Sequence, residues 1–175
     1  MYSKLKYWYT IIVMSFIAVM LWKIDNHMIS FEEKLEKATG TVSLQMYESI
    51  EHWSDSFNIP KHIAYNIAYK ETKYKGPFDF NYEHRLESHA GAVGPMQIIT
   101  KWAHKFTGRR VSEKELKHNI DLNVMISMKM LNKWHSIYKD WTLATGAYNT
   151  GSPIRNEYAI YCSTNKNYTN KWVDF

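Results

Sequence analysis

Three short segments of the 175-residue chain combine an acidic residue, small residues and amides in patterns suited to chemistry on a polar substrate. They are Lys70-Glu71-Thr72, Gly91-Ala-Val-Gly-Pro-Met-Gln-Ile98 and Ala147-Tyr-Asn-Thr-Gly151. Ile63, Ile67 and Glu71 are spaced by four, so the carboxyl group prolongs the apolar stripe of a predicted helix. A buried carboxyl group must be paired, neutral or functional. We therefore predict that Glu71 is a buried carboxyl group whose pKa is raised by desolvation, which makes it a candidate for chemistry.

In their order, these segments resemble the motifs of the soluble lytic transglycosylase family, whose fold is of the goose-type lysozyme kind. The resemblance extends over roughly residues 44 to 155 and includes the helix that begins near Asp121-Leu-Asn123-Val. It implies cleavage of the β-1,4 bond between N-acetylmuramic acid and N-acetylglucosamine in peptidoglycan, with a 1,6-anhydro product and Glu71 as the single catalytic residue. It implies six substrate-binding residues: Thr72, Gly94, Met96, Gln97, Tyr148 and Asn149. Tyr148 and Asn149 are also expected to contact Glu71, and no cofactor is implied.

Two departures from the family pattern leave other functions open. Pro95 replaces the usual Leu, and the segment from 73 to 90 is longer than the usual connection. Glu83 or Glu87 in that segment would, as a second carboxylate, make the protein a hydrolytic lysozyme of the goose type. A non-catalytic peptidoglycan-binding assembly protein would instead have lost the acid at position 71.

A metal site is not expected. His84, Glu87 and His89 match neither of the zinc-peptidase spacings, and nearby Gly and Pro residues oppose the helix that such motifs need. Cys162 is the only cysteine, which excludes an intrachain disulfide and the paired-cysteine zinc sites.

The first 23 residues are predicted to be an uncleaved membrane anchor. Tyr7 to Trp22 is a run of 16 uncharged residues with aromatic residues at both ends, close to the roughly 17 to 25 residues that span a bilayer. No small-residue cleavage site follows the run. Lys4 and Lys6 precede it, so the N-terminus should stay inside and the remainder should face the cell wall.

The remaining chain is expected to be mostly α-helical, with at most a small hairpin between about 75 and 96. Helices are predicted from about 44, over about 60–74 and 100–106, over 120–138, and from about 141. The domain organisation is then an anchor over 1–23, a helical or flexible spacer over 24–43, a catalytic domain over 44–161 and a loosely packed tail over 162–175.

Charge points to an anionic partner outside the cell. Residues 58 to 175 contain 17 basic and 10 acidic side chains, and a cationic domain attracts polyanions. The exported topology argues against nucleic acid and favours a wall polymer. Small anchored enzymes of the resembled family are associated with phage particles and secretion systems, and we favour a phage virion or its membrane.

Overall fold

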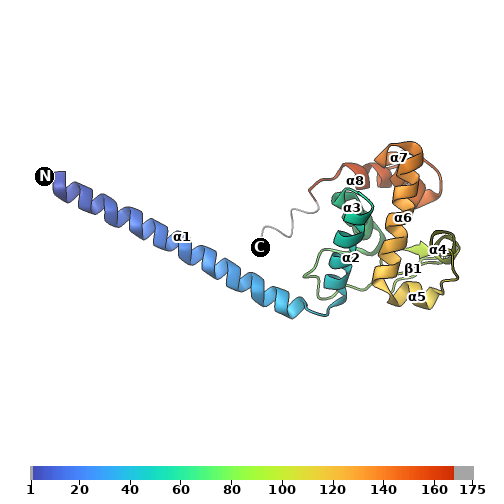
Figure 1. Cartoon of the computed structure of the whole chain (residues 1–175), viewed down its shortest axis with the longest axis horizontal. Coiled ribbons are helices and arrows are strands. Elements are labelled where there is room, and N and C mark those ends of the chain that lie inside the picture. The colour runs from blue at the N-terminus through green and yellow to red at the C-terminus, as the bar shows by residue number, and fades with distance from the viewer. Residues whose placement is uncertain (1, 168–175) are drawn as a thin grey trace. The chain divides into compact units, whose positions relative to one another are not determined.

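The computed structural model describes residues 2–167, with side chains from residue 12 onward. Over this range the chain forms eight helices and a single two-stranded sheet, so the prediction of a mostly α-helical fold is confirmed (Figure 1). The chain divides into two compact units, the first ending at Lys37 and the second beginning at Ala38.

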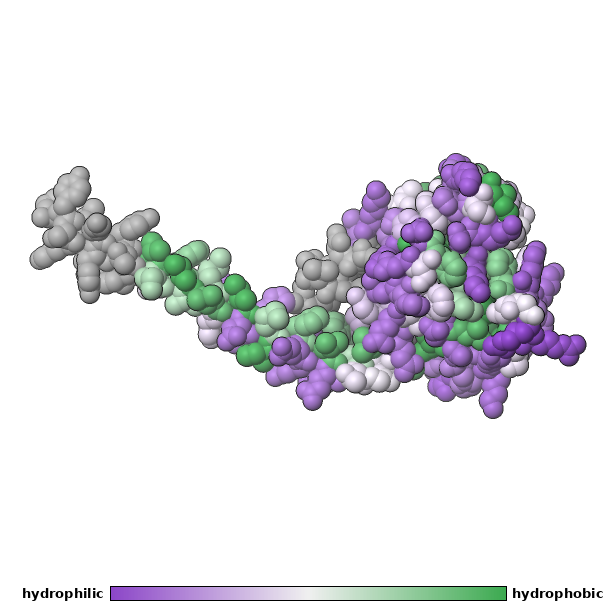
Figure 2. Space-filling model, viewed as in Figure 1, coloured by the Kyte–Doolittle hydropathy of each residue, from purple (hydrophilic) through white to green (hydrophobic). Residues whose placement is uncertain are grey.

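The first unit is one continuous helix, α1 (Tyr2–Ala38), with no break at the predicted boundary between anchor and spacer. Ile12–Ala38 is long and apolar enough to cross a membrane, with a mean hydropathy of 1.4, and its apolar window is not buried against protein. Figure 2 shows hydrophobic residues along this helix. At 1.5 Å per residue, the helix is about 56 Å long, whereas the hydrocarbon core of a bilayer is about 30 Å thick. The helix is therefore longer than a bilayer core requires, and most of its charged residues lie in its second half.

The second unit is organised around α6 (Ile120–Tyr138). This helix packs against four others: α2 (Val42–Ser56), α4 (Thr100–Thr107), α5 (Glu113–His118) and α7 (Trp141–Thr150). Val124, Met128 and Leu131 lie on one face of α6 at helical spacing, and all three are fully buried, as the sequence predicts. The remaining two helices, α3 (Lys61–Thr72) and α8 (Glu157–Thr164), pack on each other, and α8 also packs on α7.

Capping residues define where these helices begin and end. The side chain of Asn119 accepts a hydrogen bond from the backbone N–H of Leu122 and caps α6. Lys139 takes a left-handed conformation after the last turn, and Asp140 caps α7 by accepting from the N–H of Leu143. Only two residues therefore separate α6 from α7, and this tight connection folds α7 back onto α6.

The predicted hairpin exists but lies slightly later in the chain than expected. Strands β1 (Ala92–Val93) and β2 (Ile98–Ile99) pair antiparallel around the turn formed by residues 94–97. The buried side chain of Asn123 on α6 holds this turn, because its Nδ2 donates to the carbonyl of Val93 and its Oδ1 accepts from the N–H of Met96, both at 3.0 Å. A short hairpin that would be unstable alone is thus attached to the central helix.

The sequence analysis did not predict helices α5 and α8. It also placed the start of the C-terminal tail at residue 162, which lies inside α8. Residues 162–164 are the last turn of α8, and the side chain of Cys162 is fully buried. The side chain of Asn66 on α3 donates to the carbonyls of Cys162 and Asn165, which fixes the end of α8 to α3. The part of the predicted tail beyond residue 167 lies outside the described residues.

Candidate active site

Glu71 lies in the last turn of α3, which ends where Lys73 adopts a left-handed conformation with φ of 61°. Ile63 and Ile67 lie two turns and one turn earlier on the same face, and both are buried in the core. The side chain of Glu71 is half-buried, and its Oε1 accepts a hydrogen bond from the hydroxyl group of Tyr158 at 2.5 Å. Glu71 is therefore not the solvated surface acid that its position at a helix end would permit.

Two opposing effects act on the pKa of Glu71. Burial raises this pKa, because the ionised carboxylate loses hydration. The hydrogen bond from Tyr158 and the positive charge of Lys73 both lower it, because each stabilises the carboxylate. Burial is the largest effect, so the pKa of Glu71 lies above its ordinary value. This carboxyl group is suited to hold a proton and to release it to a substrate.

The hydroxyl group of Tyr158 is a reliable hydrogen-bond donor to Glu71. Burial and the negative charge of Glu71 both raise the pKa of Tyr158 well above its ordinary value, so the phenol stays protonated. Tyr158 reaches Glu71 from α8, whose packing on α3 brings the two residues together across 87 positions in sequence. Sequence reasoning missed Tyr158, and its only local signal is the helix cap at Asn156 just before it.

Glu71 lines a cavity of about 330 Å³ whose walls come from the hairpin, α4, α6 and α7. Three predicted substrate-binding residues also line it: Gln97, Tyr148 and Asn149. Among the residues lining this cavity in the described part of the chain, Glu71 is the only one with a carboxylate. The three sequence motifs, separated by more than 70 residues from first to last, thus meet around one hollow.

Each of these three residues is partly fixed by the protein. The Nε2 of Gln97 donates to the carbonyl of Gly94 at 2.9 Å, and the residue itself has a left-handed φ of 51°. The hydroxyl group of Tyr148 donates to the carbonyl of Met96 at 2.6 Å. Asn149 is exposed, and its Oδ1 accepts a hydrogen bond from Asn156. Tyr148 was expected to contact Glu71, and the negative charge of Glu71 does contribute to raising the pKa of Tyr148. The hydroxyl group of Tyr148 is bonded to the hairpin turn, whereas Tyr158 supplies the hydrogen bond to Glu71.

The other three predicted residues lie behind the cavity wall. Thr72 is buried, and its hydroxyl group bonds the carbonyls of Ala68 and Pro95 and the hydroxyl of Tyr82. Met96 is fully buried, so its side chain fills the core. Gly94 has a φ of 80°, and an added Cβ would come within 2.4 Å of the side chain of Asn123. None of the three lines the cavity: Thr72 and Gly94 lie where the hairpin turn meets α3 and α6, and Met96 fills the core. Their role in substrate binding stays a prediction.

The cavity is also lined by two tryptophans, which the sequence analysis did not assign to the site. Trp102 on α4 and Trp134 on α6 pack edge to face, with ring centroids 6.4 Å apart. The sequence signal was present, since both residues occur in predicted helices, but an aromatic residue at helical spacing is more often part of a core. Only the packing of α4 on α6 places them in one wall.

Glu83 and Glu87 are engaged on the surface and do not line this cavity. Glu83 accepts hydrogen bonds from Arg85, and Glu87 forms an ion pair with Lys117 at 2.5 Å. Among the described residues, no cluster of three or more His, Cys, Asp or Glu side chains has the arrangement of a metal site. Both glutamates of the long connecting segment thus take part in surface ion pairs.

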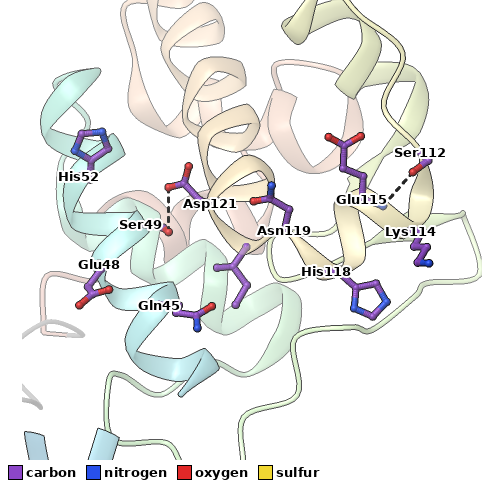
Figure 3. A pocket seen from close by; sticks show the side chains of 11 residues that line it. Gln45, Glu48, Ser49, His52, Ser112, Lys114, Glu115, His118, Asn119 and Asp121 are labelled. Atoms are coloured by element: carbon purple, nitrogen blue, oxygen red, sulfur yellow. Dashed lines mark hydrogen bonds between the residues drawn. The ribbon is translucent and has the colours of Figure 1, made fainter. Parts of the chain in front are cut away.

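A larger cavity of about 810 Å³ lies elsewhere, between α2 and the junction of α5 with α6 (Figure 3). None of the predicted site residues lines it. Its carboxylate at Asp121 accepts hydrogen bonds from Ser49 and from the indole N–H of Trp53, which joins α2 to α6. This hollow is a polar surface groove whose best-defined contacts are structural.

The mostly helical domain and its small two-stranded hairpin fit a lysozyme-like fold. Comparison with known families matches residues 48–170 to the Transglycosylase SLT domain. The match covers most of the chain, so the protein belongs to this family. A search of curated proteins finds no match. The family acts on peptidoglycan, and its matched region contains all the residues that line the Glu71 cavity.

Proposed function

We propose that the protein is a lytic transglycosylase that cleaves the β-1,4 bond between N-acetylmuramic acid and N-acetylglucosamine, with Glu71 as its single general acid and base. Membership of the Transglycosylase SLT domain family supports the reaction class. The observation that carries the residue assignment is that Glu71 is the only carboxylate lining the cavity within the described residues, and that burial raises its pKa.

The proposed reaction uses one carboxyl group twice. Protonated Glu71 first gives its proton to the glycosidic oxygen, the bond from this oxygen to C1 of the muramyl residue breaks, and N-acetylglucosamine leaves with a free 4-hydroxyl group. The 6-hydroxyl group of the same muramyl residue then bonds to C1, and its proton passes to the Glu71 carboxylate. This closes a 1,6-anhydro ring, restores the acid and consumes no water.

The surroundings of Glu71 suit both halves of this cycle. Burial favours the protonated acid at the start, whereas the hydrogen bond from Tyr158 stabilises the carboxylate after the proton has left. Ordinary glycosidases need a second carboxylate as nucleophile or base. An internal hydroxyl group makes that second carboxylate unnecessary, in agreement with the ion pairs that engage Glu83 and Glu87 on the surface.

The products of digestion test this proposal directly. Purified sacculi are incubated with the protein, and the released muropeptides are analysed by mass spectrometry. We expect muramyl ends in the 1,6-anhydro form, which are lighter by one water than reducing ends. Reducing ends would indicate a hydrolytic lysozyme, and the absence of released muropeptides would support a non-catalytic wall-binding protein.

We further propose that α1 anchors the enzyme in a membrane with its N-terminus inside, so that the catalytic domain faces the cell wall. The apolar stretch of α1 and the lysines before it support this topology. An anchored enzyme cleaves strands close to its own membrane, which suits local opening of the wall for a larger assembly. We favour a phage virion over a secretion system as that assembly.

A further inference from the structure

Helix α4 contributes an aromatic residue to the wall of the Glu71 cavity and carries positive charge next to that residue. Trp102 on this helix and Trp134 on α6 both line the cavity, and Trp134 stacks on Tyr138 with ring centroids 6.2 Å apart. Aromatic rings can pack against the apolar face of a sugar ring. The hydroxyl groups at the edge of the sugar then remain free to form hydrogen bonds with other residues. The aromatic surface therefore extends from the cavity along α6.

Two lysines on α4 lie over the ring of Trp102. The Nζ atoms of Lys101 and Lys105 are 5.7 Å and 5.2 Å from the ring centroid. Both side chains are exposed, and neither forms a salt bridge with the described residues. A cation–π contact orients an ammonium group without neutralising its charge, so both charges remain available to an anion.

The sequence around α4 strengthens this positive field. Residues 88 to 112 contain four Lys or Arg residues and no Asp or Glu. Arg109 is paired with Glu115 of α5, outside this stretch. Within it, Lys101 and Lys105 are the two cations that contact a residue lining the cavity. An anionic group carried by a bound glycan would meet these lysines next to the sugar platform.

We propose that Lys101 and Lys105 determine substrate specificity by binding carboxylates of the peptides attached to the glycan, while Trp102 packs against a sugar ring. This inference rests on the proposed function, since muramyl residues of peptidoglycan carry peptides with free carboxylates. A neutral glycan has no group for these lysines. The wall formed by α4 thus favours strands with ionised peptides over strands without them.

Neutralising the carboxylates of the substrate tests whether Lys101 and Lys105 bind those carboxylates or instead support the fold or the glycan contact. The substrates are sacculi stripped of other anionic polymers and the same sacculi with their peptide carboxylates converted to amides. The double variant Lys101→Gln/Lys105→Gln is compared with the wild-type chain. On the ionised substrate we expect KM to rise about 2- to 30-fold, the combined effect of two exposed ion pairs, with kcat unchanged. On the amidated substrate we expect no difference between the two proteins.

A matched control removes the same charge elsewhere. Lys114 and Lys166 are exposed and do not line the Glu71 cavity, so Lys114→Gln/Lys166→Gln should retain the wild-type KM on both substrates. The wild-type preference for the ionised substrate should weaken as salt is raised toward 1 M, where charges are screened beyond about 3 Å. The α4 double variant should have lost most of this salt dependence.

Three results would overturn the inference. A KM penalty that persists on the amidated substrate would mean that the lysines support the fold or the glycan contact. An equal penalty in the control variant would mean that overall charge attracts the enzyme to the wall. Failure of the wild-type chain to cleave either substrate would instead remove the proposed function and this inference with it.

Discussion

Replacing Glu71 with Gln removes the titratable proton and little else. The amide has nearly the same size as the carboxyl group, and its oxygen can still accept the hydrogen bond from Tyr158. General acid–base catalysis contributes roughly 10²- to 10⁴-fold to a rate. Because the proposed cycle uses Glu71 in both steps and no second carboxylate lines the cavity among the described residues, we expect a loss near the upper end, about 10³- to 10⁴-fold.

The same substitution should leave the fold intact or stabilise it. Burial raises the pKa of Glu71, so the folded protein binds this proton more tightly than the unfolded chain does. Above the folded pKa, the ionised carboxylate therefore lowers the free energy of unfolding, and a neutral Gln removes that cost. The advantage of Gln should disappear as the pH falls through the folded pKa, because Glu71 then becomes neutral as well.

The assay combines release of muropeptides from purified sacculi with thermal unfolding at neutral and at acidic pH. Glu87→Gln is the matched control, because it removes a surface carboxylate whose ion pair contributes only about 0 to 1 kcal/mol. The control should keep most of the wild-type rate. A Glu71→Gln variant that is folded and retains a tenth of the wild-type activity would refute the single-carboxylate mechanism.

Three further substitutions, one of them with a matched control, test the surroundings of Glu71 and the hairpin turn. Tyr158→Phe removes a donor that lowers the pKa of Glu71, so the alkaline limb of the pH–rate profile, where the acid loses its proton, should move to higher pH; a shift to lower pH would contradict this. Thr72→Val removes the hydroxyl group that bonds the carbonyl of Pro95 and the hydroxyl of Tyr82, so the free energy of unfolding measured in urea should fall by about 1–3 kcal/mol. Lost activity at unchanged stability would instead indicate that Thr72 contacts the substrate. Gly94→Ala should cost more than 2 kcal/mol, roughly the strain of a left-handed Ala plus a steric clash. Gly91→Ala, with similar φ and open space around its Cβ, should cost only about 1 kcal/mol, and equal losses would exclude the clash.

The helices that the sequence predicts are those with a regular apolar face and a recognisable cap. In α6, Asn119 begins the helix and Val124, Met128 and Leu131 repeat on the buried side, so local pattern and tertiary packing agree. Helix α5 has only six residues, too few to show a period. Helix α8 has only eight residues, and its short buried face, which includes Tyr158, Ala159 and Cys162, is held by packing on both α3 and α7.

The site divides in the same way. Spacing alone places Glu71 on the buried face of its helix, and the structure brings Gln97, Tyr148 and Asn149 to the same cavity. Burial of Met96 was not evident from its motif, because a methionine in a turn can face either a cleft or the core. Its fully buried side chain follows from the way Asn123 holds the turn against α6.

The sequence by itself determined the helical class, the apolar N-terminal segment and the one carboxyl group that local periodicity directs inward, because these properties depend on neighbours within a few turns. Tertiary structure alone decided which hydroxyl group meets that carboxyl. Tyr158 reaches Glu71 only because α8 docks on α3, and such a contact between residues 87 positions apart leaves no periodic signal in the chain. The electrostatic environment of an active site is made by such distant contacts, since burial and hydrogen bonding depend on what packs around a group.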